Sequence, residues 1–430
     1  MPTTRPPGTM RQPFHGWRIV GYASLAVILT SPGQTPGVSP FIDPMMADLG
    51  ISRSAISTAY LIGTLLSAAA LPTVGRLIDR FGARVTMAAV GAAFGAILVG
   101  LSMITGIVGL TAGFVGIRLA GQGALGMIAV TVTAYWFDRR RGTALGIVSA
   151  VGAAGITLSP ILIERLIAYH DWRTVWLLEG LAVWLIVIPI AVFGIRNRPH
   201  ELGQHIDGTP APAGGPPPAS SASRAVALRT PYFWVLVAGN ATVGMLITAV
   251  TFHQISLLGA RGLSTAQAAA NFLPQTAAGL AATLLAGVLV DRIDRPRLLV
   301  TAAMLLLAGA LAGATVLTPG WSAMGYGAAL GAAMGVMKAV EAALTPRMFG
   351  TGHLGAIRGI VAATGVAGTA LGPVLFAVSF DTTGSYTMIL LGSIALPIAV
   401  SVAALTVPLP ARAHLRHGGA AGAGSRTVGS

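Results

Sequence analysis

Charged side chains are rare inside the apolar stretches of this 430-residue sequence, so the few that occur there are the first candidates for chemistry. Lys338 and Glu341 lie three residues apart in one such stretch, and a helix would place both on one face. An ionisable group inside a bilayer costs about 2.5–3.5 kcal/mol, which makes it a candidate for function. Lys338, the only lysine of the chain, could bind an anion, with Glu341 as its resting partner or as a proton carrier. The two charges could instead neutralise each other in a structural pair.

Two further charges and several uncharged polar residues extend this set. Arg118 lies near the middle of another apolar stretch, where it could bind a substrate, couple protons or satisfy backbone carbonyl groups. Glu179 lies one to two turns inside a third stretch. His253 offers a titratable ring, although a histidine at a helix end is more often an interfacial hydrogen-bonding residue. The uncharged residues that could line a cavity are Gln34, Asn240, Gln254 and Gln275.

Motifs for enzyme chemistry are not found. The chain has no cysteine, no phosphate-binding loop of the ATPase type, no H-E-x-x-H and no His/Cys cluster. Gly121-Gln-Gly-Ala-Leu-Gly126 fits the dinucleotide pattern G-x-G-x-x-G, but it lies in a long apolar helix without the strand that pattern needs. We therefore expect close helix packing there, and we expect no enzyme activity, no cofactor and no metal.

The composition indicates a membrane protein. Hydrophobic residues make up 54% of the chain and charged residues 9%, whereas a soluble protein has about 25% charged residues. A spanning helix needs about 20 apolar residues, and twelve stretches qualify. They cover residues 17–42, 55–75, 85–106, 108–136, 143–168, 174–195, 232–257, 268–290, 298–317, 321–346, 357–379 and 386–408.

The net charge of +14 could suggest nucleic-acid binding, but its distribution favours membrane topology. With twelve spans, 21 of the 27 cations fall on the side that carries the N-terminus, against four on the other. Positive residues concentrate on the cytoplasmic side. We therefore expect a multi-pass protein of the cell inner membrane with both termini cytoplasmic, a retained first helix and no nucleic-acid partner.

A Pro/Gly/Ser-rich stretch divides the spans into six and six. Such a composition is typical of a flexible linker. The expected organisation is a six-helix bundle over 1–195, a cytoplasmic linker over 196–230, a second bundle over 231–410 and a disordered cytoplasmic tail over 411–430. The fold class is all-α.

The two halves repeat each other. Gly75-Arg-Leu-Ile-Asp-Arg-Phe-Gly-Ala-Arg84 has a degenerate copy in Gly287-Val-Leu-Val-Asp-Arg-Ile-Asp-Arg-Pro-Arg297, 212 residues later. Residues 146–160 match 359–373 at an offset of 213, through shared Gly, Ile, Val and Pro positions. Two blocks at nearly one offset predict two halves related by an axis along the membrane normal, with a binding site between them near the midplane.

The first of these blocks resembles the loop signature between helices 2 and 3 of the major facilitator superfamily. The resemblance implies the twelve-helix major facilitator fold and a gate in which Asp79 closes the cytoplasmic side. Alternatively, the arginines of this loop could serve only to set the orientation of the protein in the membrane. The gating residues that the resemblance implies are Gly75, Asp79, Arg80, Gly82 and Arg84, with Asp291 and Arg292 in the copy.

Other segments resemble bacterial relatives of the monocarboxylate and oxalate/formate carriers. Arg118 and Gln122 resemble the superfamily's helix 4 motif for proton coupling, with a spacing of four residues where three is common. In the animal-type carriers helix 8 holds an Asp and an Arg, and the matching positions here are Gly279 and Thr283. The segments that carry the resemblance are His15–Arg18, Gly33–Phe41, Asp171–Arg173, Gly355–Gly359 and Asp381–Tyr386.

The expected function is secondary active transport of a small organic anion, a mono- or dicarboxylate, by alternating access. A proton or a counter-substrate would supply the coupling. The alternative is efflux of a drug-like or natural-product compound, which the uncharged helix 8 and the apolar lining favour. Membrane lipid is the expected surrounding, and a monomer is the expected state.

Overall fold

The computed structural model describes residues 14–138, 140–208, 224–292, 297–349 and 354–409, and these parts of the chain form helices and connecting turns without a strand. The helices of the first half are α1 (Gly16–Ile28), α2 (Thr35–Val38), α3 (Ile42–Leu49), α4 (Arg53–Leu101), α5 (Ile107–Ile117), α6 (Gly126–Trp136), α7 (Arg141–Tyr169) and α8 (Trp172–Pro189). The later helices are α9 (Arg224–Arg229), α10 (Pro231–Phe252), α11 (Gln254–Gly259), α12 (Thr265–Ala270), α13 (Phe272–Arg292), α14 (Arg297–Gly313), α15 (Trp321–Phe349), α16 (Leu354–Thr383), α17 (Thr387–Ser393) and α18 (Ala395–Thr406).

The 49-residue helix α4 contains two of the predicted spans, because its backbone breaks at Gly82. Gly82 has φ +79° and ψ 162°, a left-handed conformation that favours glycine. A Cβ atom at this position would also lie 2.8–2.9 Å from the side chain of Asn197. With α4 divided here, the nine long apolar helices found in the described residues and the shorter apolar helices α1 and α14 account for the twelve predicted spans.

The first predicted span, 17–42, is not one continuous helix. α1 ends at Ile28, and the chain continues through the short 3₁₀ turn Ser31–Gly33, α2 and a second 3₁₀ turn at Ser39–Phe41. A proline opens each of these pieces, at a position where it needs no hydrogen-bond donor. The proline spacing therefore breaks this span into short turns on its way to α3.

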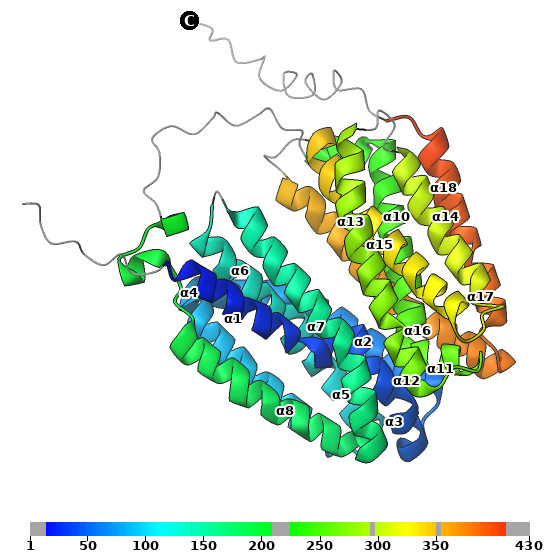
Figure 1. Cartoon of the computed structure of the whole chain (residues 1–430), viewed down its shortest axis with the longest axis horizontal. Coiled ribbons are helices and arrows are strands. Elements are labelled where there is room, and N and C mark those ends of the chain that lie inside the picture. The colour runs from blue at the N-terminus through cyan, green and yellow to red at the C-terminus, as the bar shows by residue number, and fades with distance from the viewer. Residues whose placement is uncertain (1–13, 139, 209–223, 293–296, 350–353, 410–430) are drawn as a thin grey trace, which may run out of the picture.

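The buried apolar side chains form two separate clusters. One cluster contains side chains from residues 19–195 together with Phe252, and the other contains side chains from residues 227–404. Figure 1 shows the corresponding helix groups, blue to green for the first and green to red for the second. Each cluster is the core of one helical bundle, so the molecule consists of two packed halves.

The two bundles contact each other at one end of the molecule and diverge toward the other (Figure 1). We call the end that carries residues 195–208 and the start of α10 the linker end, and the opposite end the distal end. The contacts between bundles join α4 to α16, α7 to α12 and α13, and α2 to α10. The described side chains therefore close the seam at the distal end.

Candidate functional site

A cavity of about 780 Å³ lies between the two halves. Side chains from both bundles line it, in agreement with a site on the axis that relates the repeats. Its wall contains the charged residues Arg118, Lys338 and Glu341, the amides Gln34, Gln122, Asn240 and Gln275, and the hydroxyl residues Thr35, Thr64, Ser67, Thr157, Thr248, Thr251, Thr276 and Thr369.

Arg118 is held on the first-half wall of this cavity by contacts to α4 and to the 3₁₀ turn Ser31–Gly33. Its Nε donates to Thr64 Oγ1 at 3.1 Å, and its Nη1 donates to the carbonyl of Gly33 at 3.0 Å. The guanidinium carbon also lies 4.7 Å from the ring centre of Tyr60. The side chain is only 2% exposed. Nη2 donates no hydrogen bond to the described residues, so this atom is the one that remains for a ligand.

The close approach of Gly33 makes the Arg118 contact to its carbonyl possible. A Cβ at Gly33 would lie 2.3 Å from the carbonyl oxygen of Ile117 and 3.0 Å from the Cα of Gly121. Two glycines therefore face each other where the first span crosses the fourth. Larger residues would separate the backbones and move the Gly33 carbonyl away from Nη1.

Gln122 also lines the cavity, and the backbone explains its unusual spacing from Arg118. The segment Arg118–Leu125 between α5 and α6 is a π-helix, which has a wider turn than an α-helix. A separation of four residues in this wider turn leaves both side chains on the cavity wall. The extra residue in the motif is thus accommodated by the π-helical turn.

Lys338 and Glu341 both belong to α15 and line the second-half wall of the cavity. Lys338 is exposed and Glu341 is half-buried. The carboxylate acts electrostatically on the ammonium group, as expected for a pair one helical turn apart. The cavity therefore has a cation on each wall, Arg118 from the first half and Lys338 from the second.

The amides differ in how much hydrogen-bonding capacity they leave for a ligand. Gln34 Nε2 donates to Thr30 Oγ1 at 3.1 Å, and Asn240 Nδ2 donates to the carbonyl of Val361 at 3.4 Å. Gln275 is 6% exposed, and its Oε1 accepts no hydrogen bond from the described residues. This oxygen is an acceptor available to a ligand that carries a donor.

His253 and Gln254, two of the predicted site residues, do not line the cavity, and His253 instead has the hydrogen-bonding position at a helix end that was its alternative. Nε2 of His253 lies 2.9 Å from the Pro373 carbonyl, and the ring packs against Tyr386 near the distal end. Gln254 is fully buried and donates from Nε2 to the carbonyl of Ala268 at 2.9 Å. The reason is that α10 ends at Phe252, so His253 lies in the junction that follows it and Gln254 begins α11, beyond the cavity.

The residues of the predicted linker-end gate are separated from the second half in this conformation. Asp79 is exposed and makes no hydrogen bond or ion pair with the residues that the structure describes. Arg84 Nη2 donates to the carbonyl of Val192 at 2.6 Å, within the first half. Arg80 lies over the Phe81 ring, and Gly75 is half-buried. The side chains of Asp291 and Arg292 lie outside the described part of the chain.

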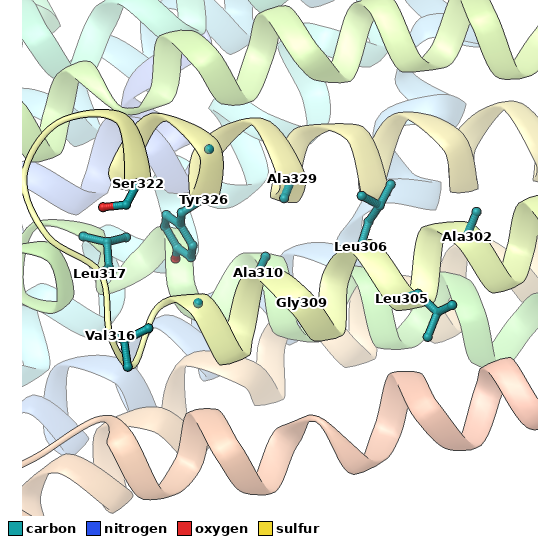
Figure 2. Close-up of a pocket in the computed structure, with 12 residues that line it drawn as sticks. Ala302, Leu305, Leu306, Gly309, Ala310, Val316, Leu317, Ser322, Tyr326 and Ala329 are labelled. Atoms are coloured by element: carbon teal, nitrogen blue, oxygen red, sulfur yellow. The ribbon is translucent and has the colours of Figure 1, made fainter.

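Another cavity, of about 470 Å³, lies between α14 and α15 on the surface of the second half. Figure 2 shows its lining of Ala and Leu side chains, with Ser322 and Tyr326 near one end. It contains no charged residue and does not involve the first half. The central cavity is therefore the better candidate for a transported solute.

Sequence reasoning missed the residues that hold Arg118. Thr64 and Tyr60 anchor its guanidinium, and Ser67, Thr157 and Thr276 add hydroxyls to the cavity. Small hydroxyl residues are common in spanning helices, so no local signal distinguishes these from the others. Only the packing of α4 against the fourth span brings Thr64 to Arg118.

Comparison with known proteins shows to which family this chain belongs. Residues 23–279 match the family model described as the Major Facilitator Superfamily. A triacylglyceride transporter of Mycobacteroides abscessus is 31% identical over 203 residues, which are 45% of this chain and 37% of that protein. An oxalate:formate antiporter of Oxalobacter formigenes is 28% identical over 219 residues, 50% of each chain. The matched parts thus span half or less of the length of these relatives.

The fold is similar to that of a solved structure over almost the whole chain. A bacterial homologue of the human lysosomal transporter Spinster, in an inward-facing and occupied conformation, aligns with a TM-score of 0.71. The alignment covers 93% of this chain and 97% of that one at 16% identity, so it shows a shared fold. With the family model matching more than half of the sequence, the chain belongs to the Major Facilitator Superfamily of membrane transporters.

Proposed function

We propose that this protein is a secondary active transporter of a small organic anion, a mono- or dicarboxylate. The observation that carries the proposal is the pair of cations on opposite walls of one cavity, Arg118 with its available Nη2 and Lys338. A guanidinium and an ammonium are the side-chain groups best suited to a carboxylate. An anion that contacts both would also connect the two halves of the molecule.

Closure at one end supports transport by alternating access. The contacts between halves lie at the distal end, so the cavity reaches solution at the linker end. The excess of cations at the linker end supports its assignment as cytoplasmic, in the cell inner membrane, with both termini inside. In the opposite conformation Asp79 would close the linker end, which agrees with its exposure here.

The coupling partner is a proton or a counter-substrate. Glu341 lies beside Lys338 on the cavity wall, where the carboxyl could take up a proton as an anion is released. Exchange of one anion for another would need no such step. The similarity to an oxalate:formate antiporter supports a carboxylate substrate and is compatible with exchange.

The alternative is efflux of a drug-like or natural-product compound. Most of the cavity wall is uncharged, and the helix 8 positions Gly279 and Thr283 carry no charge. The similarity to triacylglyceride transporters supports an apolar cargo in the same way. The two candidates differ in whether a carboxylate alone drives transport.

Transport assays in proteoliposomes test the proposal. We expect saturable uptake of labelled oxalate, formate, lactate or pyruvate, dependent on a pH gradient or on an internal counter-anion. Lys338→Gln should abolish this uptake, and Lys338→Arg, which keeps the charge, should retain a measurable part. Absence of uptake of all four anions, together with raised drug tolerance of expressing cells, would reject the anion carrier in favour of the exporter.

A further inference from the structure

A carboxylate of the second half binds the start of α4 at the distal end. Asp381, near the end of α16, accepts a hydrogen bond at 2.8 Å from the backbone N–H of Ser54. That N–H belongs to the first turn of α4, where unpaired donors and the helix dipole favour a negative charge. The contact joins the two halves directly.

A second carboxylate makes the reciprocal connection. Glu164, near the end of α7 in the first half, accepts a hydrogen bond at 2.5 Å from the hydroxyl of Thr265. Thr265 is the first residue of α12 in the second half. Each half thus contributes one carboxylate to the other at the same end of the molecule.

The internal repeat relates these two contacts. Ser52 and Ser264 are the N-caps of α4 and α12, and they are separated by 212 residues, the offset between Gly75 and Gly287. The carboxylates come from the fifth span of the first half and the fifth span of the second. At the offset of 213 found for those spans, Asp381 corresponds to position 168, four residues or one helical turn from Glu164. Because Asp381 and Glu164 do not occupy matching positions of the repeat, a comparison of the two half-sequences does not identify them as a pair.

The seam beside Asp381 is incompletely satisfied. Arg53 is 7% exposed and donates from Nη2 to Asp43 at 2.6 Å, while its Nε and Nη1 have no partner among the described residues. Its guanidinium lies 5.2 Å from the ring centre of Phe380 in the second half. Closure of the distal end therefore buries two donors of Arg53 without a partner, and the free-energy cost of this burial favours opening. The hydrogen bonds to Asp381 and Glu164 must offset that cost.

We propose that Asp381 and Glu164 are gating residues that form a paired lock on the distal end. The lock stabilises the conformation whose cavity opens to the linker end. Removing either carboxylate shifts the population toward the conformation that is open at the distal end. The inference rests on the alternating access of the proposed function but is independent of which solute is carried.

A distance measurement between spin labels tests the lock. The chain contains no cysteine, so Met103→Cys and Met388→Cys, exposed positions of the two halves, can be labelled without background. In detergent or nanodiscs without any anion, we expect one principal distance for the parent protein, which carries the two labels and an intact lock. Asp381→Asn and Glu164→Gln should each raise the ratio of a longer distance to it by about tenfold, the usual scale for one charged hydrogen bond.

Asp171→Asn is the matched control. Asp171 accepts a hydrogen bond from the backbone N–H of Thr174 at 2.6 Å, so it is a carboxylate on a helix start, but within one half. This substitution should leave the distance distribution unchanged. A distribution that stays the same in both lock variants, or that changes equally in the control, would overturn the proposal.

A variant of the hydrogen-bond donor Thr265 distinguishes loss of the lock from a general loss of structure. Thr265→Val removes the hydroxyl that donates to Glu164, and should shift the distances at least as far as Glu164→Gln, whose amide oxygen can still accept a weaker hydrogen bond. The double variant should shift them no further than Thr265→Val alone, because both changes act on the same interaction. Additive shifts would contradict a direct contact. Because no anion is present, failure of anion transport would leave this result unaffected.

Discussion

At the scale of single residues, Arg118 is both a structural and a ligand-binding group. Nε and Nη1 donate to Thr64 and Gly33, and the ring of Tyr60 lies beside the charge. These contacts compensate the burial of the charge and orient the remaining nitrogen. The two interpretations of Arg118, a substrate ligand or a donor to backbone carbonyls, are therefore compatible in one side chain.

Arg118→Lys tests this dual role. A lysine cannot donate to Thr64 and Gly33 and also present a third nitrogen to the cavity, because its donors share one atom. We expect the affinity for the transported anion to fall by about tenfold or more, measured as the KM of uptake. Thr64→Val, which removes one anchor and keeps the guanidinium, should change KM less. Equal effects of the two variants would argue that Arg118 acts on packing alone.

At the scale of elements, the number of spans and the repeat could be predicted, because hydropathy and sequence offsets depend on local residues. The breaks in the first span and the π-helical turn at Arg118–Leu125 could not, since they depend on contacts with other helices. The same limit explains the site residues. Of the predicted residues, Arg118, Lys338, Glu341 and four amides line the cavity, whereas His253 and Gln254 lie just beyond the end of α10.

The crossing of the first and fourth spans can be tested through its glycines. Gly33→Ala places a Cβ 2.3 Å from a backbone oxygen, so we expect a loss of about 1–3 kcal/mol in stability and a lower Tm. Gly21→Ala in α1 is the control, because a Cβ there would meet nothing within 4 Å. A Gly33→Ala protein that melts like the control would show that the backbones can separate without cost.

At the scale of the whole molecule, closure at the distal end determines which solution reaches the cavity. Four hydrogen bonds between described side chains or backbone groups join the halves, and they involve Ser39, Ser54, Thr157 and Glu164 of the first half. Their positions could not be predicted from the sequence, because every one joins residues more than 100 positions apart.

Solvent access to the cavity can be measured with a single cysteine. Met334 lines the cavity on α15, and Met334→Cys would be the only thiol in the chain. We expect a membrane-impermeant thiol reagent to modify it faster from the linker end than from the distal end, in oriented vesicles without substrate. Combination with Asp381→Asn should raise the distal rate. Faster modification from the distal end of the otherwise unchanged protein would contradict the closed seam.

The hydroxyls of Thr157 and Thr276 touch each other across the halves and also belong to the cavity wall. A solute that displaces or joins this contact acts on the seam and on its own binding site at once. Occupancy and conformation are then thermodynamically linked. If binding of the solute changes the ratio of the two conformations by a certain factor, the affinities of those conformations for the solute differ by the same factor. A mutation at this contact therefore acts on both the conformational ratio and the observed affinity for the solute.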